Sequence, residues 1–334
     1  MSNSTTMKDF LLLEFSDLRD QQIFYAMFFS LVYLVTVIGN LIIAVVTTLD
    51  ESLHTPMYFF LRNLSMLDSC YISVTVPNSC VNSLLGNSSI SKAGCATQVF
   101  LVVFFVFVEL LFLTIMAHDR FAAICNPLHY PSIMNHHLCV HSTLASLLSG
   151  LVYAALHTSN TFRLSFCHSH AVQQLFCDIP ALLKLSCSDT FSNWITILIS
   201  ILVVGGGCFI FIIKSYIHIF SAVLKLPAGA DRTKAFSTCV PHILVAGVFL
   251  ISGSYVYLRP STMSVGTWDM VLPMFYSVIP PLLNPIIYSH KNTQIQYALR
   301  KLMTRMVFSG NVLRIREAFP TQLSHGHVVA HQYT

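Results

Sequence analysis

Charged residues are scarce in this chain: only 10% of its 334 residues are Asp, Glu, Lys or Arg, whereas 54% are hydrophobic. Soluble domains carry about 25% charged residues. The mean hydropathy of +0.68 is also far above that of a water-exposed domain. This composition excludes an ordinary soluble protein and points to a chain that lies largely in lipid.

Long apolar stretches are plentiful, and most have no charge in their central part, which is the signature of transmembrane segments. Each must form a helix, because lipid offers no water to satisfy exposed backbone groups. The sequence therefore predicts an all-α membrane protein with seven spans. They cover about 23–49, 57–81, 95–118, 138–160, 190–213, 235–258 and 270–290.

The basic residues predict the orientation of these spans. With the N-terminus outside, twelve Lys and Arg residues fall on the cytoplasmic side and six on the outer side, as the positive-inside rule requires. The net charge of +4 mostly reflects this bias and does not indicate a nucleic-acid partner. Residues 1–22 contain acids and no long apolar core, so they do not resemble a cleavable signal peptide.

The chain shows no internal repeat and divides into four parts. An extracellular tail, 1–22, precedes one helical domain, 23–291. Residues 292–306 place apolar and basic residues on different faces of a helix. This pattern predicts a short amphipathic helix on the inner leaflet, in contact with membrane lipid. Residues 307–334 predict a disordered cytoplasmic tail. The expected location is the plasma membrane, crossed several times.

Four cysteines fall on the predicted outer side, where the redox environment favours disulfides. Cys95 begins the third span, and Cys167, Cys177 and Cys187 lie in the loop 161–189. Four cysteines allow three pairings, which spacing alone does not resolve. The sequon at Asn3 lies in the outer tail and predicts a glycan.

Two acidic residues, Asp68 and Glu109, fall at similar depths near mid-bilayer. A charge there costs about 2.5–3.5 kcal/mol on insertion scales, so it usually serves a function. Two close carboxylates do not both ionise without a cation. They either hold a small hard cation through oxygen ligands or form a protonated, hydrogen-bonded packing pair. A proton-relay transporter is a third interpretation, but it predicts inverted repeats, which are missing.

An acid–base pair, Asp119-Arg120, lies where the third apolar run meets a polar loop. At about 1.5 Å per helical residue, roughly 37 Å separates Arg120 from Cys95, enough to cross a bilayer. One helix thus connects a cysteine on the outer side of the membrane to an ion pair on the inner side. This geometry suits a protein that carries a signal across the membrane. The last span ends in Asn284-Pro285-x-x-Tyr288, in which the proline kinks the helix.

Enzyme chemistry finds little support. His118, His129, His136 and His137 gather near the inner face, but their spacing matches no metal-ligand pattern. No nucleophile–base pair and no phosphate-binding loop occurs in the sequence. The prediction is that the chain is not an enzyme.

Taken together, these segments resemble the olfactory receptor family of rhodopsin-like G-protein-coupled receptors, over about residues 8–305. The resemblance rests on short motifs in every part of the bundle. They are Gly39-Asn40, the run 53–61 (Leu-His-Thr-Pro-Met-Tyr-Phe-Phe-Leu), Leu64-Ser65-x-x-Asp68, the run 116–130 around Asp119-Arg120, Ser215-Tyr216, the run 234–239 with His242, and Pro281-x-Leu283-Asn284-Pro285-x-Ile287-Tyr288.

The resemblance implies a receptor for volatile odorants that couples to a stimulatory olfactory-type heterotrimeric G protein and raises cyclic AMP, often with a trafficking chaperone as partner. It implies the disulfides Cys95–Cys177 and Cys167–Cys187. It implies a sodium-type site at Asp68 and Glu109, with no other cofactor. The activation residues that it implies are Asp119, Arg120, Tyr216, His242, Asn284, Pro285 and Tyr288.

A ligand site in such a bundle should be apolar with few polar anchors. Val102, Val103, Val106 and Phe107 lie one to two turns outward from Glu109 on the third span. The resemblance adds Ser200, Ile201, Val204, Leu250, Gly253, Ser254 and Tyr257. No charge occurs among these positions, so the expected ligand is uncharged and largely apolar, with one or two hydrogen-bonding groups.

The chain departs from the family pattern beside the ion pair. His118 and Phe121 stand where the family has tyrosine, and Phe249-Leu250-Ile251 replaces Phe-Tyr-Gly in the sixth span. Phe121 offers no hydroxyl near Arg120, so the restraint of the resting state is expected to differ. A receptor that does not signal is the alternative interpretation.

Overall fold

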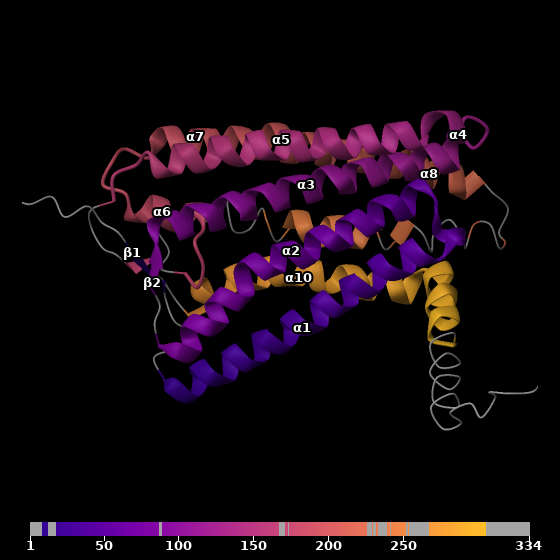
Figure 1. Cartoon of the computed structure of the whole chain (residues 1–334). Helices are drawn as coiled ribbons and strands as arrows, with labels where there is room; N and C mark the ends of the chain where they lie inside the picture. Colours follow the sequence, from indigo (N-terminus) through magenta and orange to yellow (C-terminus); the bar gives the residue numbers. More distant parts are fainter. Residues whose placement is uncertain are drawn as a thin grey trace, which may run out of the picture.

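The computed structural model describes residues 9–12, 18–86, 89–166, 171–172, 174–225, 229, 232, 239–240, 242–251, 253 and 267–304, and only the backbone of 267–276 and 290–291. Long helices run side by side as one elongated bundle (Figure 1). They are α1 (Arg19–Leu49), α2 (Pro56–Leu85), α3 (Lys92–Cys125), α5 (His136–Phe162), α7 (Phe191–Ser200), η2 (Ile201–Gly205), α8 (Gly206–Lys225) and α10 (Thr267–Lys291).

Among the described helices, four are long and apolar enough to cross a membrane: α1, α3, α5 and the continuous unit Phe191–Lys225. α2 and α10 lie along them in the bundle, and His242–Ile251 is a shorter apolar helix within the predicted sixth span. The unit that ends at Lys225 runs well past the predicted limit of residue 213. Its inner end continues because α8 keeps a buried face, with Tyr216, Ile219 and Val223, beyond the apolar run.

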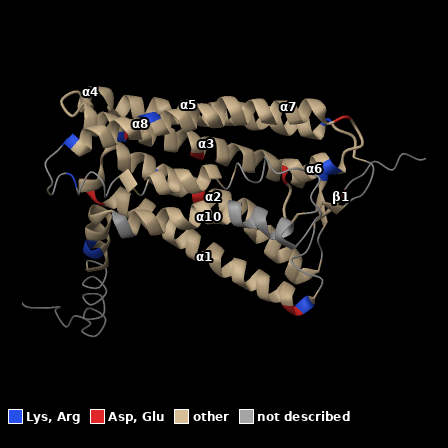
Figure 2. Cartoon of the chain, turned by 180° about the vertical axis from the view of Figure 1, so that it is seen from behind, with Lys and Arg blue, Asp and Glu red and all other residues tan. Residues whose placement is uncertain are grey.

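α3 lies at the centre of the bundle and contacts α2, α5 and α8. Its contact with α5 depends on Gly150, where a Cβ atom would lie 2.6 Å from Cγ2 of Val108 and 3.2 Å from the ring of Phe104. A glycine here lets the two helices approach closely, as small residues do between membrane helices. Figure 2 shows that charged residues lie mainly at the two ends of the bundle, with acidic residues of α2 and α3 in its middle.

The outer end carries a small three-stranded sheet that the all-α prediction missed. β1 (Asp9–Leu12) pairs antiparallel with β2 (Ser89–Ser91) and parallel with β3 (Ala171–Val172). Part of the predicted tail 1–22 is therefore ordered, because Phe10 and Leu12 are buried against the outer end of the bundle. Strands of two to four residues give too short an alternation to be read from sequence.

The disulfide Cys95–Cys177 is confirmed, with a Cα–Cα distance of 5.5 Å. It ties the outer end of α3 to the loop that contains the short helix α6 (Ile179–Leu185). Cys187 is also disulfide-bonded. Cys167, its predicted partner, and the predicted glycan acceptor Asn3 lie outside the described residues.

At the inner end, the turn η1 (Glu51–Leu53) joins α1 to α2, and α4 (Tyr130–Ile133) precedes α5. A helix over residues 293–304 turns away from α10 across the end of the bundle (Figure 1). Tyr58 bonds the side chains of Asn292 and Gln294, and Nζ of Lys301 lies 3.0 Å from Oδ2 of Asp50. These contacts hold the 293–304 helix against η1 and the start of α2. The predicted tail 307–334 lies outside the described residues.

Candidate ligand cavity and transmission core

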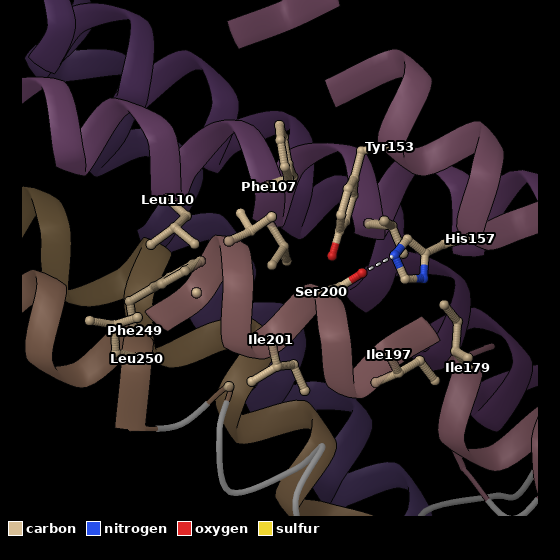
Figure 3. A pocket seen from close by; sticks show the side chains of 15 residues that line it. Phe107, Leu110, Tyr153, His157, Ile179, Ile197, Ser200, Ile201, Phe249 and Leu250 are labelled. Atoms are coloured by element: carbon tan, nitrogen blue, oxygen red, sulfur yellow. Dashed lines mark hydrogen bonds between the residues drawn. The ribbon is translucent and has the colours of Figure 1, made fainter. Parts of the chain in front are cut away.

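A cavity of about 150 Å³ opens in the outer half of the bundle, between α3, α5, the α7–η2 segment and residues 249–253. An apolar cavity of about this volume can hold a molecule the size of benzene. Figure 3 shows the side chains that line it, and almost all are apolar. They are Val103, Val106, Phe107, Leu110, Tyr153, His157, Ile179, Ile197, Ser200, Ile201, Val204, Gly205, Phe249, Leu250 and Gly253.

Eight of the residues predicted for the ligand site line this cavity, three from α3, three from α7–η2, and Leu250 and Gly253. Val102 is buried but does not line the cavity. Ser254 and Tyr257 lie outside the described residues. The structure thus brings together positions that are up to 150 residues apart in the chain.

The sequence reasoning missed the contribution of α5. Tyr153 and His157 both line the cavity, together with Leu110, Ile179, Ile197, Gly205 and Phe249. An imidazole within a membrane span was the available signal, since polar residues inside membranes often serve a function.

The polar groups of the cavity gather in one corner. Nε2 of His157 and Oγ of Ser200 lie 3.0 Å apart, a hydrogen bond in which either group can donate. The ring of Tyr153 stacks on Phe107 with centroids 4.3 Å apart, and it lies 4.4 Å from the ring of His157. Figure 3 shows Leu110, Phe249 and Leu250 at the opposite end. The cavity thus has one polar corner and an apolar remainder.

The π-helical turn η2 begins immediately after Ser200. Such turns insert one extra residue into an α-helix and often occur at functional sites. Here the turn presents Ile201, Val204 and Gly205 to the cavity in succession. A regular helix would direct a different set of side chains inward.

Beneath the cavity, four buried polar side chains form the core of the bundle: Asn40, Asp68, Glu109 and Asn284. Nδ2 of Asn284 donates to Oδ2 of Asp68 at 2.6 Å, and Nδ2 of Asn40 donates to the carbonyl of Pro281 at 2.9 Å. One oxygen of each of the four side chains finds no hydrogen-bond partner in the described part of the chain. Unsatisfied buried oxygens are the donor set that a small hard cation takes, so these residues fit a sodium ion.

At the inner end of α3, Asp119 is buried and Nη2 of Arg120 lies 3.7 Å from its Oδ2. The hydroxyl of Tyr130 on α4 donates to Oδ1 of Asp119 at 2.7 Å. Partial burial, and then the carboxylate of Asp119, raise the pKa of Tyr130, so the phenol keeps its proton. Tyr130 therefore provides a hydroxyl to the ion pair that Phe121 does not.

Three of the other predicted activation residues, Tyr216, His242 and Tyr288, lie near Arg120. The hydroxyl of Tyr216 on α8 lies 2.7 Å from Nδ1 of the buried His242. Tyr216, His242 and the buried Tyr288 all lie within electrostatic range of the guanidinium group. Pro285 packs against Gly39, where a Cβ atom would lie 3.2 Å from the proline ring. α3, α8, α10 and the 242–251 helix thus converge on one arginine.

The bundle is similar to that of squid rhodopsin, with a TM-score of 0.69 over 87% of this chain and 88% of that one, at 19% identity. This likeness shows the class of fold: a rhodopsin-like bundle of seven helices. Residues 29–306 match the olfactory receptor family. The chain belongs to this family, whose members are receptors in the membrane and not enzymes.

Curated relatives extend over almost the whole chain. The human protein named Olfactory receptor 14C36 is 66% identical over 312 residues, which cover 93% of this chain and 100% of the relative. The human Olfactory receptor 14A16 is 46% identical over 303 residues, covering 91% and 98% of the two chains.

The described residues contain no cluster of three or more His, Cys, Asp or Glu side chains arranged to hold a metal ion.

Proposed function

We propose that this receptor binds a volatile, uncharged, largely apolar odorant with one hydrogen-bonding group, and couples to a stimulatory olfactory-type G protein that raises cyclic AMP. The observation that carries the ligand class is the cavity with its single polar corner at His157 and Ser200. A charged ligand would find no opposite charge among the described lining residues. A pure hydrocarbon would leave the polar corner without a new partner.

The apolar surface of the ligand fills the space toward Leu110, Phe249 and Leu250. Its polar group, such as a carbonyl or hydroxyl, bonds His157 or Ser200. Burial contributes about 25 cal/mol per Å² of apolar surface, and the hydrogen bond contributes about 0.5–1.5 kcal/mol net. Burial of apolar surface therefore supplies most of the affinity, while the hydrogen bond in the polar corner fixes the orientation of the ligand.

Activation is a shift in population between two arrangements of the bundle. The cavity contacts α3, the continuous unit Phe191–Lys225 and the 242–251 helix. The same three elements carry Arg120, Tyr216 and His242 at or toward the inner end. A ligand that favours one packing of the outer ends thereby biases the Tyr216–His242 contact. When this contact opens, Arg120 becomes available to the G protein.

Asp68, Glu109 and Asn284 would hold a sodium ion by their free oxygens. When bound, the ion supplies the positive charge that lets both carboxylates ionise. The Asn284–Asp68 hydrogen bond links α10 to α2.

A cyclic AMP reporter screen over diverse volatiles tests the proposal, in cells that co-express a trafficking chaperone. We expect activation by neutral ketones, esters, aldehydes or alcohols. Arg120→Ala should reach the surface, as measured by antibody labelling, but should raise no cyclic AMP with any agonist. Activation mainly by amines or carboxylates would refute the ligand class, and full signalling by Arg120→Ala would refute the role of the arginine.

A further inference from the structure

A second cavity, of about 380 Å³, opens at the inner end of the bundle, beside the turn between α1 and α2 and the start of α5. It shares no lining residue with the outer cavity. Its walls combine polar and apolar side chains at the level where the helices leave the membrane. They are Thr47, Leu53, His54, Thr55, Pro56, Tyr58, Phe59, Arg62, Met134, His136 and Cys139.

The lining carries one arginine and two histidines but no acidic residue. The guanidinium carbon of Arg62 lies 5.5 Å from the centroid of the Phe59 ring, and no carboxylate in the described part of the chain pairs with it. The nearest buried acid in the α1–α2 link, Asp50, is already paired with Lys301. Arg62 is therefore a half-buried cation without a counter-ion among the residues that the structure describes.

Hydrogen-bond donors toward the cavity come from two sides. Nε2 of His54 lies 3.1 Å from the carbonyl of Thr48 and is used there. Donation to a ligand thus falls to Arg62 on α2 and to His136, the first residue of α5. Both helices begin beside the cavity, so the positive ends of their dipoles add to the charge of Arg62.

The cavity also has an apolar side. Leu53 and Met134 are buried in its wall, and the ring of Phe59 lies beside the guanidinium group of Arg62. A site for a free anion in water needs no such wall. A site at the edge of the inner leaflet does, because its ligand carries acyl chains next to its phosphate. Basic pockets between helices on the cytoplasmic side bind anionic lipid head groups.

We propose that this cavity binds an anionic phospholipid of the inner leaflet, with its phosphate on Arg62 and His136 and its glycerol and upper acyl carbons against Leu53, Phe59 and Met134. The bound lipid adds a further contact between the α1–α2 turn and the start of α5. The site does not depend on odorant binding.

Native mass spectrometry of the purified full-length receptor tests the site, after incubation with a phosphoinositide bisphosphate, phosphatidylserine or phosphatidylcholine. We expect retained phosphoinositide on the wild type and about a fivefold loss or more in Arg62→Ala, as for one cation at a lipid head group. His136→Ala should lose less. Lys225→Ala, which removes an exposed cytoplasmic cation away from the cavity, should retain the lipid like the wild type.

Equal retention by Arg62→Ala and the wild type would overturn the proposal, and so would equal retention of phosphatidylcholine. Full competition by the chain-free head group, inositol trisphosphate, at equal concentration would show a soluble phosphate site instead of a lipid site. A photo-crosslinking phosphoinositide keeps the test valid if Arg62→Ala misfolds. On the wild type it should label peptides within 47–62 and 134–139. Labelling confined to the basic 293–304 helix would place the lipid elsewhere and contradict the proposal.

Discussion

The outer cavity and the polar core beneath it differ in how their polar groups are paired. In the outer cavity, the two central polar groups, His157 and Ser200, bond each other, and apolar side chains surround them. In the core, Asp68, Glu109 and Asn284 each keep a buried oxygen without a partner in the described structure, as does the hydroxyl of Tyr288 further inward. The cavity is thus suited to recognise the shape of a ligand, and the core to exchange hydrogen-bond partners.

This contrast follows from the free-energy cost of burying a polar atom without a hydrogen-bond partner. A buried polar atom without a partner costs about 1–3 kcal/mol. A structure can keep several such atoms where an ion or a rearranged side chain becomes their partner in another state. Buried polar networks are accordingly sensitive to single changes. The apolar outer cavity tolerates change more gradually, because dispersion contacts are small and numerous.

The largest expected effect on stability tests the close contact between α3 and α5, the helix pair that runs through both the outer and the inner parts of the bundle. Gly150→Ala places a methyl group against Val108 and Phe104, and we expect a loss of about 1–3 kcal/mol from overpacking between α3 and α5. The matched control is Gly207→Ala, whose added Cβ meets nothing within 4 Å. Thermal unfolding in detergent measures both variants. Equal melting temperatures would contradict the close α3–α5 contact.

The polar corner makes a smaller and more selective prediction. His157→Leu should raise the half-maximal concentration about tenfold, or about 1.4 kcal/mol, for agonists with a carbonyl or hydroxyl group. It should leave an agonist without such a group unchanged or improved, because the variant cavity is more apolar. Dose–response curves for a matched agonist pair measure the difference. A uniform loss across both agonists would mean that His157 supports packing only.

The ion site separates two interpretations of the inner core. If a sodium ion binds Asp68 and Glu109, replacing sodium by a bulky organic cation should shift agonist potency several-fold in the wild type. Glu109→Gln keeps the size of the side chain and removes its charge, so the shift should disappear. Absence of any sodium dependence in the wild type would favour the protonated, hydrogen-bonded pair instead.

The smallest effect lies outside the membrane. Hydrogen bonds from Ser52, and then from Lys301, lower the pKa of Asp50 from its ordinary 3.8 to about 2. The stabilisation from this carboxylate is present above pH 3.8 and is lost as the pH falls toward 2. Asp50→Asn should therefore melt slightly lower than the wild type at neutral pH and converge with it near pH 2. A difference that does not change with pH would exclude the charge as its cause.

Much of the architecture could be predicted because lipid imposes strict rules. The apolar runs, the basic-residue bias and the depth of Asp68 and Glu109 follow from the one-dimensional pattern alone. The motifs around Arg120 and Asn284 then indicated the family, which the relatives confirm. The strand Asp9–Leu12 could not be predicted, because its pairing partners lie 80 and 160 residues away in loops without a periodic signal.

Among the cavity residues too, some could be predicted from the sequence and others could not. Val103, Val106 and Phe107 were accessible to sequence reasoning, since depth on one helix follows from counting turns. His157 was not, because the face that α5 turns inward depends on where Gly150 meets α3. The hydroxyl that Tyr130 provides to Asp119 was missed for a similar reason: two residues eleven apart meet only because the chain turns into α4.

The sequence by itself determined which segments lie in the membrane, which side faces the cytoplasm and which residues form the inner motifs, because hydrophobicity and charge act on each segment separately. Only the tertiary structure decided which side chains share a cavity, and which buried oxygens and cations, Arg62 among them, find no partner in the described part of the chain. These properties depend on distances between helices and on their rotation, and one misplaced turn in any helix changes all of them.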